Sequence, residues 1–204
     1  MPGPRLTQEK IVAAAIRMAD EQGLQAVSLR GVAKRLNVHV TSLYNHISTK
    51  EALLSELMAA LMTEAKLPTD PKSWQDWVKR FALALRTLAA HHPGAFHVFH
   101  RGPASGEAAM QSLEAAVQAF RADGFSLVST WCAIKAVNVT VLGLILDDLA
   151  RHANPALAVD IEQLPPAQFP NIHELHAVAE STDTFEFVLD TLIAGIAAKW
   201  GFQT

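Results

Sequence analysis

Two short amphipathic segments joined by a tight turn, within residues 28–51, constrain the fold more than any other part of this chain. Apolar spacing predicts a helix over about 29–36, and Ser28 can cap it by accepting a hydrogen bond from a free backbone N–H. Asn37 fits the turn, because asparagine tolerates the left-handed backbone conformation better than most residues other than glycine. A second helix is predicted over about 40–46. This layout is typical of a helix-turn-helix, in which the second helix lies in a major groove of DNA.

The next segment, Ser48-Thr49-Lys50-Glu51, has the pattern of a capping box and predicts a third helix with Lys50 in its first turn. A lysine at that end opposes the helix dipole, whereas an anion is favoured there. Two interpretations of Lys50 remain open: a contact with a DNA phosphate, or an ordinary solvated lysine.

At these residues the chain resembles the TetR family of bacterial transcriptional regulators. The matching residues are Leu36-Asn37-Val38, then Thr41-Ser42-Leu43-Tyr44-Asn45-His46, then Lys50-Glu51-Ala52-Leu53-Leu54. Two residues depart from the family pattern: Asn37 stands where glycine is usual, and His39 stands where serine or threonine caps the recognition helix. The second departure affects the details of base contact.

The resemblance implies a double-stranded DNA operator as partner. It places Arg30 where the tetracycline-repressor branch uses an arginine on a base. The side chains that we expect to contact DNA lie on the two helices of the motif and at the start of the third: Arg30, Val40, Thr41, Ser42, Tyr44, Asn45, His46 and Lys50.

Charge supports a DNA-binding head independently of the resemblance. Residues 1–50 contain seven Lys and Arg against three Asp and Glu, whereas residues 51–204 contain ten against seventeen. A basic segment joined to an acidic one indicates an anion-binding module attached to a body that does not bind polyanions.

Helical periodicity continues through the rest of the chain, and no strand alternation, repeat or low-complexity tract interrupts it. The fold class that we predict is therefore all-α. Residues 1–50 form the expected helix-turn-helix head, and residues 51–204 form a larger body for ligand binding and dimerisation. Further helices are expected over about 8–22, 48–66, 73–91, 106–122, 127–151 and 184–200, with one turn of helix near 173–179. For the first of these, Thr7 can cap the start and Gly23 can end the helix.

Two helices of the body carry unusually apolar sequences. The one expected at about 127–151 is apolar on more than one face, so we expect it to be buried on several sides. The last, opened by Asp183-Thr184-Phe185-Glu186, contains a run at 185–196 that resembles the C-terminal domain of the tetracycline-repressor branch. We expect these helices from two copies to form a four-helix interface in a homodimer, with Leu192 and Ile193 in it.

Polar residues within the long apolar helix suggest a site for a small-molecule inducer. Lys135 and Asn138 lie near Trp131 in the sequence, and buried polar groups need partners. They either satisfy one another or a dimer mate, or they line a pocket with aromatic residues from the preceding segment. The predicted ligand-binding set is Phe96, Phe99, His100, Phe120, Trp131, Lys135 and Asn138.

The sequence predicts neither catalysis nor a bound metal or cofactor. Nine histidines are present, but no His-Glu-x-x-His motif accompanies them. Cys132 is the single cysteine, so no internal disulfide can form, which fits a reducing compartment. No uninterrupted apolar run reaches about 18 residues and the start lacks a signal-peptide core, so we expect no membrane partner and a cytoplasmic location. The alternative function is a helical metalloprotein or enzyme with an incidental helix-turn-helix.

Overall fold

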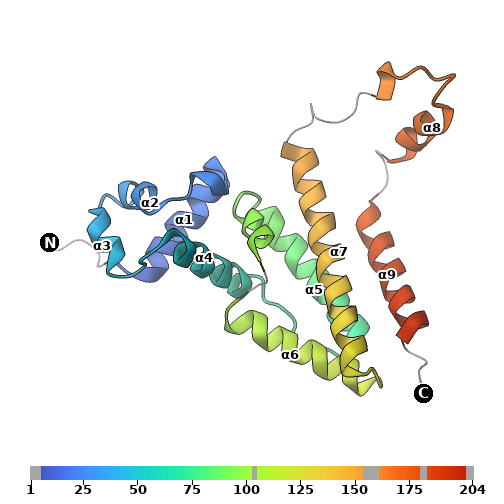
Figure 1. Cartoon of the computed structure of the whole chain (residues 1–204), viewed down its shortest axis with the longest axis horizontal. Coiled ribbons are helices and arrows are strands. Elements are labelled where there is room, and N and C mark those ends of the chain that lie inside the picture. Colours follow the sequence, from blue (N-terminus) through green and yellow to red (C-terminus); the bar gives the residue numbers. More distant parts are fainter. Residues whose placement is uncertain (1–5, 103–104, 154–160, 180–182, 201–204) are drawn as a thin grey trace.

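A computed structural model describes residues 6–102, 105–153, 161–179 and 183–200, and within these ranges the chain is helical without strands. Figure 1 shows a small N-terminal head, coloured blue, beside a larger group of long helices. The all-α fold class predicted from the sequence is confirmed.

The head is built from α1 (Gln8–Gln22), η1 (Leu24–Ala26), α2 (Leu29–Arg35) and α3 (Val40–Tyr44). The Thr7 hydroxyl accepts a hydrogen bond from the Lys10 N–H and caps α1, and Gly23 ends that helix with φ 83°. Both ends were predicted from capping chemistry. α3 is shorter than the predicted 40–46, because Asn45 and His46 already lie beyond its last turn.

The long helix α4 (Lys50–Glu64) leads out of the head. Its cap is Thr49, whose hydroxyl accepts from the Ala52 N–H at 3.0 Å, so the predicted capping role of Ser48 was wrong by one residue. Thr49 has the extended backbone of a cap residue, with φ −137° and ψ 163°. α4 packs against α1, and also against α6 and η2 of the body.

The body consists of α5 (Trp74–His91), η2 (Ala95–Arg101), α6 (Glu107–Ala122), α7 (Leu127–Ala153), η4 (Ile161–Gln163), α8 (Pro170–Ala179) and α9 (Thr184–Trp200). α5, α7 and α9 pack together, and α6 packs against α4, α5 and α7. In Figure 1, η4 and α8 lie together away from these helices. The helical turn predicted near 173–179 is therefore part of a longer helix, and the predicted stop at Gly201 lies outside the described residues.

One continuous apolar core runs from the head into the body. In the body it includes an aromatic cluster in which Trp74 stacks on Phe120 with ring centroids 5.1 Å apart, and Phe125 meets both rings edge-on. The buried Trp77 Nε1 donates to the Ser112 carbonyl oxygen at 3.0 Å and ties α5 to α6. Buried indole N–H groups need such a partner.

The head and the body approach each other closely at Gly94, just before η2. A Cβ atom there would stand 2.1 Å from the carbonyl oxygen of Ala19 in α1, so no other residue fits without moving the backbone. Glycine at this position lets the two backbones approach each other.

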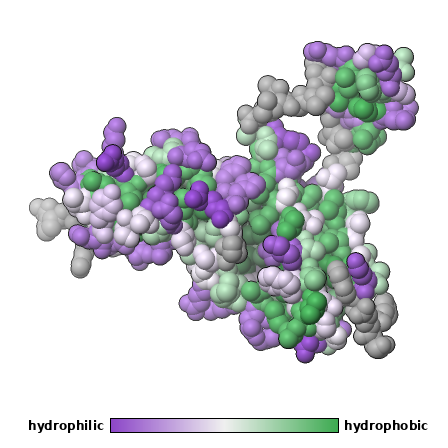
Figure 2. Space-filling model, in the orientation of Figure 1, coloured by the Kyte–Doolittle hydropathy of each residue, from purple (hydrophilic) through white to green (hydrophobic). Residues whose placement is uncertain are grey.

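The outer face of α7 departs from the sequence prediction. Val137, Val141 and Ile145 face the core, but Leu127, Val128, Trp131 and Val139 are exposed, so α7 is not buried on several sides within one chain. Phe187 of α9 is exposed as well. Figure 2 shows apolar side chains, in green, gathered over this part of the body. Among the described residues, α7 also has the length and hydropathy of a membrane span, a composition that a core or interface helix shares.

Candidate functional site

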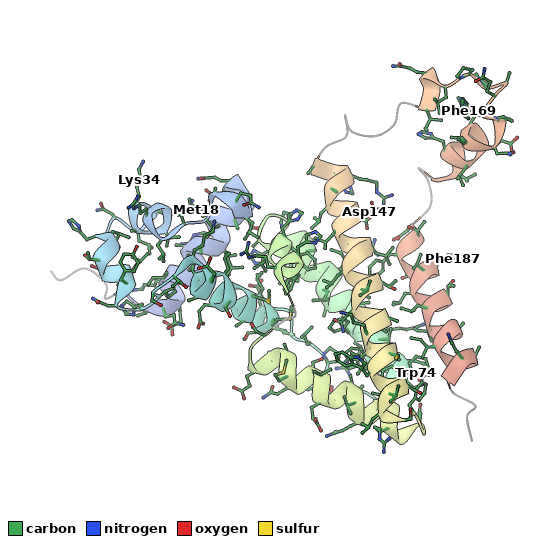
Figure 3. The ribbon with its side chains drawn as sticks, in the orientation of Figure 1. Met18, Lys34, Trp74, Asp147, Phe169 and Phe187 are labelled. Atoms are coloured by element: carbon green, nitrogen blue, oxygen red, sulfur yellow. The ribbon has the colours of Figure 1, made fainter. Side chains whose placement is uncertain are left out.

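The start of α2 is held by Ser28, whose hydroxyl accepts from the Gly31 N–H at 3.1 Å, as predicted. Arg30 follows and is exposed, while its neighbours Leu29 and Val32 are buried. The capping bond thus fixes the first turn while Arg30 projects into solvent. Lys34 also leaves α2 on the outside of the head, as Figure 3 shows.

The turn between α2 and α3 has the geometry that the sequence predicted. Asn37 has φ 53°, within the left-handed region. Two backbone bonds close the end of α2: Val38 N–H donates to the Ala33 carbonyl at 3.0 Å, and Asn37 N–H donates to the Lys34 carbonyl at 3.1 Å. This pair of bonds is the Schellman motif, which normally uses glycine. Asn37 therefore takes the left-handed backbone conformation that glycine usually supplies in this motif.

α3 is anchored by Leu43, and by Ile47 just after the helix ends, both of which are buried. On its other side Thr41, Tyr44, Asn45 and His46 are exposed, and Val40 and Ser42 are half-buried. His39 occupies the cap position without a side-chain hydrogen bond. The first backbone N–H groups of α3 therefore lack the usual hydroxyl partner from their cap residue.

Lys50 is the first residue of α4 and is half-buried. The helix dipole there favours an anion, and the capping bond of Thr49 fixes the lysine at the start of the helix. Only residues 45–49 separate Lys50 from the end of α3, so the start of α4 and the outer face of α3 belong to one short stretch of chain.

An ion pair that the sequence analysis missed braces α2 against α1. Both guanidinium NH₂ groups of Arg35 donate to the Glu21 carboxylate, with Nη1 and Oε2 2.7 Å apart. The hydrogen bond from Arg35 lowers the pKa of the Glu21 carboxyl below its ordinary value. The pairing depends on two residues fourteen apart in different helices, so no local pattern indicated it.

The predicted ligand-binding residues occupy separate parts of the body. Phe96 and Phe99 are buried in η2 and meet edge to face, 4.9 Å apart. Phe120 is buried with Trp74 and Phe125. On α7, Trp131 and Lys135 are exposed, whereas Asn138 is half-buried and donates to the Ile134 carbonyl at 2.9 Å. His100 is exposed and stacks with His97 at 6.1 Å.

Two hollows in the described surface are lined by other residues than those predicted. One, of about 340 Å³, lies between α4 and η2, where Met58, Val98 and Arg101 are among its walls. The other, of about 250 Å³, lies between α5 and α9, beside Lys79, Arg86 and Phe185. Arg86 stacks over the Phe185 ring at 4.6 Å. None of the seven predicted residues lines either hollow.

Comparison with known families agrees with this geometry over most of the chain. Residues 11–57 match the family described as bacterial regulatory proteins, tetR family, and residues 67–200 match the tetracyclin repressor-like C-terminal domain. This chain belongs to the TetR family. It is a ligand-responsive DNA-binding transcriptional regulator, and the resemblance seen in the sequence is confirmed in both parts.

Three relatives illustrate the match. An HTH-type transcriptional regulator of Saccharopolyspora erythraea is 36% identical over 155 residues, which cover 75% of this chain and 66% of that protein. The class G tetracycline repressor protein of Vibrio anguillarum is 30% identical over 199 residues, or 94% of this chain and 93% of the relative. The crystal structure of the TetR family protein ActR of Streptomyces coelicolor in complex with actinorhodin superposes with a TM-score of 0.81 at 26% identity, and the match covers 100% of both chains.

Proposed function

We propose that this regulator is a repressor: a homodimer binds an operator through its two heads and leaves it when a small molecule binds the body. The head, residues 1–50, supplies the DNA-binding surface, and residues 51–204 supply the ligand site and the dimer interface. The outward face of α3, beside the fixed first turn of α2, is the observation that carries this proposal. Relatives that are named repressors support the direction of the response.

The exposed residues of the head suggest separate roles. The fork of Arg30 suits the two acceptors of a guanine edge. Tyr44 and Lys50 suit phosphates, which position the protein without reading sequence. The remaining candidates, Val40, Thr41, Ser42, Asn45 and His46, face the bases, and the methyl groups of Val40 or Thr41 suit a thymine methyl.

The dimer interface that we propose uses the outer faces of α7 and α9. On α7, Leu127, Trp131 and Val139 follow one another at multiples of four residues, so they form one exposed stripe. Phe187 on α9 is more exposed than any of these three side chains. Leu192 and Ile193, which the sequence analysis placed in the interface, pack against the core of their own chain and are less suited to it.

For the inducer, we propose a site between α7 and the segment from Phe96 to Phe120. The named relatives indicate the kind of regulator: one is a tetracycline repressor, and ActR was crystallised with actinorhodin. Aromatic walls and a few polar groups, among them Asn138 and His100, suit a largely apolar small molecule. Ligand entry would require these side chains to move, since none of them lines either of the two hollows described above.

We also propose that the protein acts without a catalytic step and in the cytoplasm. The family consists of regulators and not enzymes. Within the described residues, no group of three or more His, Cys, Asp and Glu side chains is placed to bind a metal ion. Those observations leave the alternative of a helical metalloprotein without support.

The test is fluorescence anisotropy with a labelled DNA fragment from upstream of the protein's own gene, beside a scrambled fragment of equal length. Binding to the first should be about 10³-fold tighter or more, the range for specific over non-specific DNA. Tetracycline and actinorhodin then serve as displacement probes, followed by a library of aromatic small molecules. Equal affinity for both fragments, in protein shown to be dimeric, would refute the operator proposal. An operator complex that persists with every probe would refute only release by this class of molecule.

A further inference from the structure

His92, at the C-terminal end of α5, joins three elements that are far apart in the sequence. Its ring nitrogen Nδ1 lies 2.7 Å from Oδ2 of Asp20 in α1, and Nε2 lies 3.0 Å from Oε1 of Glu64 in α4. One body residue therefore contacts the last turns of both long helices that support the DNA-binding head. Neither the motifs nor the predicted ligand site accounts for this contact.

The two contacts together indicate which protonation state of the ring fits the structure. An ionised carboxylate only accepts hydrogen bonds, and a neutral imidazole has a single N–H to donate. Both contacts of His92 can be hydrogen bonds to carboxylates only when both ring nitrogens carry a proton. With both carboxylates ionised, this geometry fits an imidazolium cation between Asp20 and Glu64.

The surroundings make this contact a specific joint between head and body. The other oxygen of Asp20 accepts from the backbone N–H of Ala95 at 2.9 Å, so the same carboxylate binds the body twice. Next to it, Gly94 lies against the backbone of Ala19. The side chains of His92 and Asp20 are only 20% and 21% exposed, so the pair is partly shielded from water.

The charged groups that face His92 are Asp20 from α1 and Glu64 from α4, and both are acidic. Burial lowers the pKa of His92, but the hydrogen bonds to Asp20 and Glu64 outweigh it and raise the pKa above its ordinary value. A raised pKa in the docked form means that docking is stabilised at low pH. That stabilisation is complete below the ordinary histidine pKa and is lost as the pH rises through the raised value.

We propose that His92 is a positioning residue that, when protonated, locks the DNA-binding head onto the body, and that its deprotonation releases one of the two carboxylates. The locked form holds α1 and α4 at a fixed angle to α5. Loss of the proton leaves one N–H for two acceptors, so either Asp20 or Glu64 is set free. The arrangement of the heads then becomes more variable under alkaline conditions.

Amide hydrogen exchange of the Ala95 N–H in the full-length protein tests the lock without any DNA. We expect its protection factor, corrected for the intrinsic pH dependence of exchange, to fall about tenfold between pH 6 and pH 9, which corresponds to about 1.4 kcal/mol. His92→Gln should be poorly protected at both pH values. His92→Arg should stay protected at both, because a guanidinium keeps its charge and can donate to both carboxylates.

The matched control is His91→Gln, which removes the exposed neighbouring histidine and should keep the wild-type pH profile. A wild-type profile that is flat with pH, or an His92→Arg profile that follows the wild type, would overturn the proposal. NMR titration of the His92 ring in the unmodified protein gives a second measurement that needs no variant. A pKa at or below the ordinary histidine value of about 6.5 would overturn it as well.

The consequence for DNA binding rests on the proposed function. The operator affinity of wild type and of His92→Gln should differ at pH 6 and converge by pH 9. His92→Arg should match His91→Gln at pH 6 and differ from it at pH 9, because only His92→Arg keeps the locked form there. Because exchange at Ala95 is measured without DNA, a failed DNA experiment with an intact exchange profile would count against the proposed function and leave the lock standing. Equal operator affinities at pH 6 with a flat exchange profile would refute the lock itself.

Discussion

The head and the body of this protein complete their apolar surfaces in different ways. In the head, each short helix buries its apolar side chains against a neighbour within the same chain, and the outward residues of α3 are mostly polar. In the body, α7 and α9 bury one face each and leave Leu127, Val128, Trp131, Val139 and Phe187 exposed. Figure 3 shows Phe187 on the side of α9 that faces away from α5.

This difference teaches that the two regions depend on different partners. The polar outer face of the basic head suits a polyanion such as DNA. DNA can bind this face without any change in the apolar core. An exposed apolar stripe on the body suits a second copy of the same surface. In the function that we propose, the body therefore determines whether two heads are held together, and the head determines which DNA they bind.

The largest expected effect comes from breaking the body surface. Phe187→Glu places a charge where we expect a partner's apolar side chains, so it should convert the dimer to monomer. Operator affinity should then fall by about 10²-fold or more, since one half-site contact replaces two linked ones. Sedimentation velocity and fluorescence anisotropy measure the two changes.

Met110→Glu is the matched control, because Met110 is also exposed and apolar but lies on α6, at 51% exposure against 72% for Phe187. It should leave both the dimer and its operator affinity unchanged. A Phe187→Glu protein that remains dimeric at micromolar concentration would show that another surface forms the dimer.

Gly94→Ala is expected to have the next largest effect, because it breaks the contact between the two regions. The new Cβ would stand 2.1 Å from the Ala19 carbonyl oxygen, and backbone cannot yield as a side chain does. We expect a loss of about 1–3 kcal/mol in the free energy of unfolding, the usual cost of overpacking. Thermal and urea unfolding measure it.

The comparison variant is Gly31→Ala in the head. Its Cβ would meet the Met18 Cε at 2.6 Å, which is the flexible end of a side chain that can move aside. The loss should therefore be clearly smaller than for Gly94→Ala. Equal losses in the free energy of unfolding would mean that the backbone contact between Gly94 and Ala19 makes Gly94 no less tolerant of alanine than Gly31.

Arg30→Ala tests base recognition by the head without affecting the body. Loss of a bidentate contact with guanine should cost about 1–3 kcal/mol on the operator and relax preference at one base pair. A binding-site selection from random DNA, done in parallel with wild type, measures the preference. Arg30 would be a phosphate contact, and not a base contact, if operator and random DNA lost the same affinity.

The smallest effect is expected for Lys50→Ala. This variant tests whether Lys50 contacts a phosphate, in contrast to the base contact proposed for Arg30. A lost phosphate contact should lower affinity on all sequences alike and reduce the slope of log affinity against log salt by about one unit per half-site. Anisotropy titrations between 50 and 200 mM salt, roughly the range over which such slopes are measured, give the slope. An unchanged slope would leave Lys50 as a solvated lysine.

What the sequence predicted correctly depends on chemistry within a few residues. Thr7, Ser28, Gly23 and Asn37 act at helix ends, and each interaction joins residues no more than five apart. The error at Ser48 was of the same local kind: two adjacent hydroxyl residues could each serve as the cap, and backbone geometry selected Thr49.

Contacts between distant segments could not be predicted in this way. His92 meets Asp20 across 72 residues of sequence and Glu64 across 28, and no periodic pattern relates them. The same limit applies to the inducer site, where aromatic residues grouped by composition lie in separate clusters. For α7, helical spacing indicated apolar faces, but it did not distinguish a face covered by the same chain from one left exposed.

The placement of three of the four tryptophans gives the protein two distinct fluorescence signals. Trp74 and Trp77 are buried in the body, each only 2% exposed, whereas Trp131 is 64% exposed on the face that we assign to the dimer. Indole fluorescence shifts to longer wavelength in water. The emission of Trp74 and Trp77 therefore reports the packing of the core, and the emission of Trp131 reports whether a partner protomer covers that side chain. Dilution of the native protein would change the second signal while the first stays constant, and denaturant would change both.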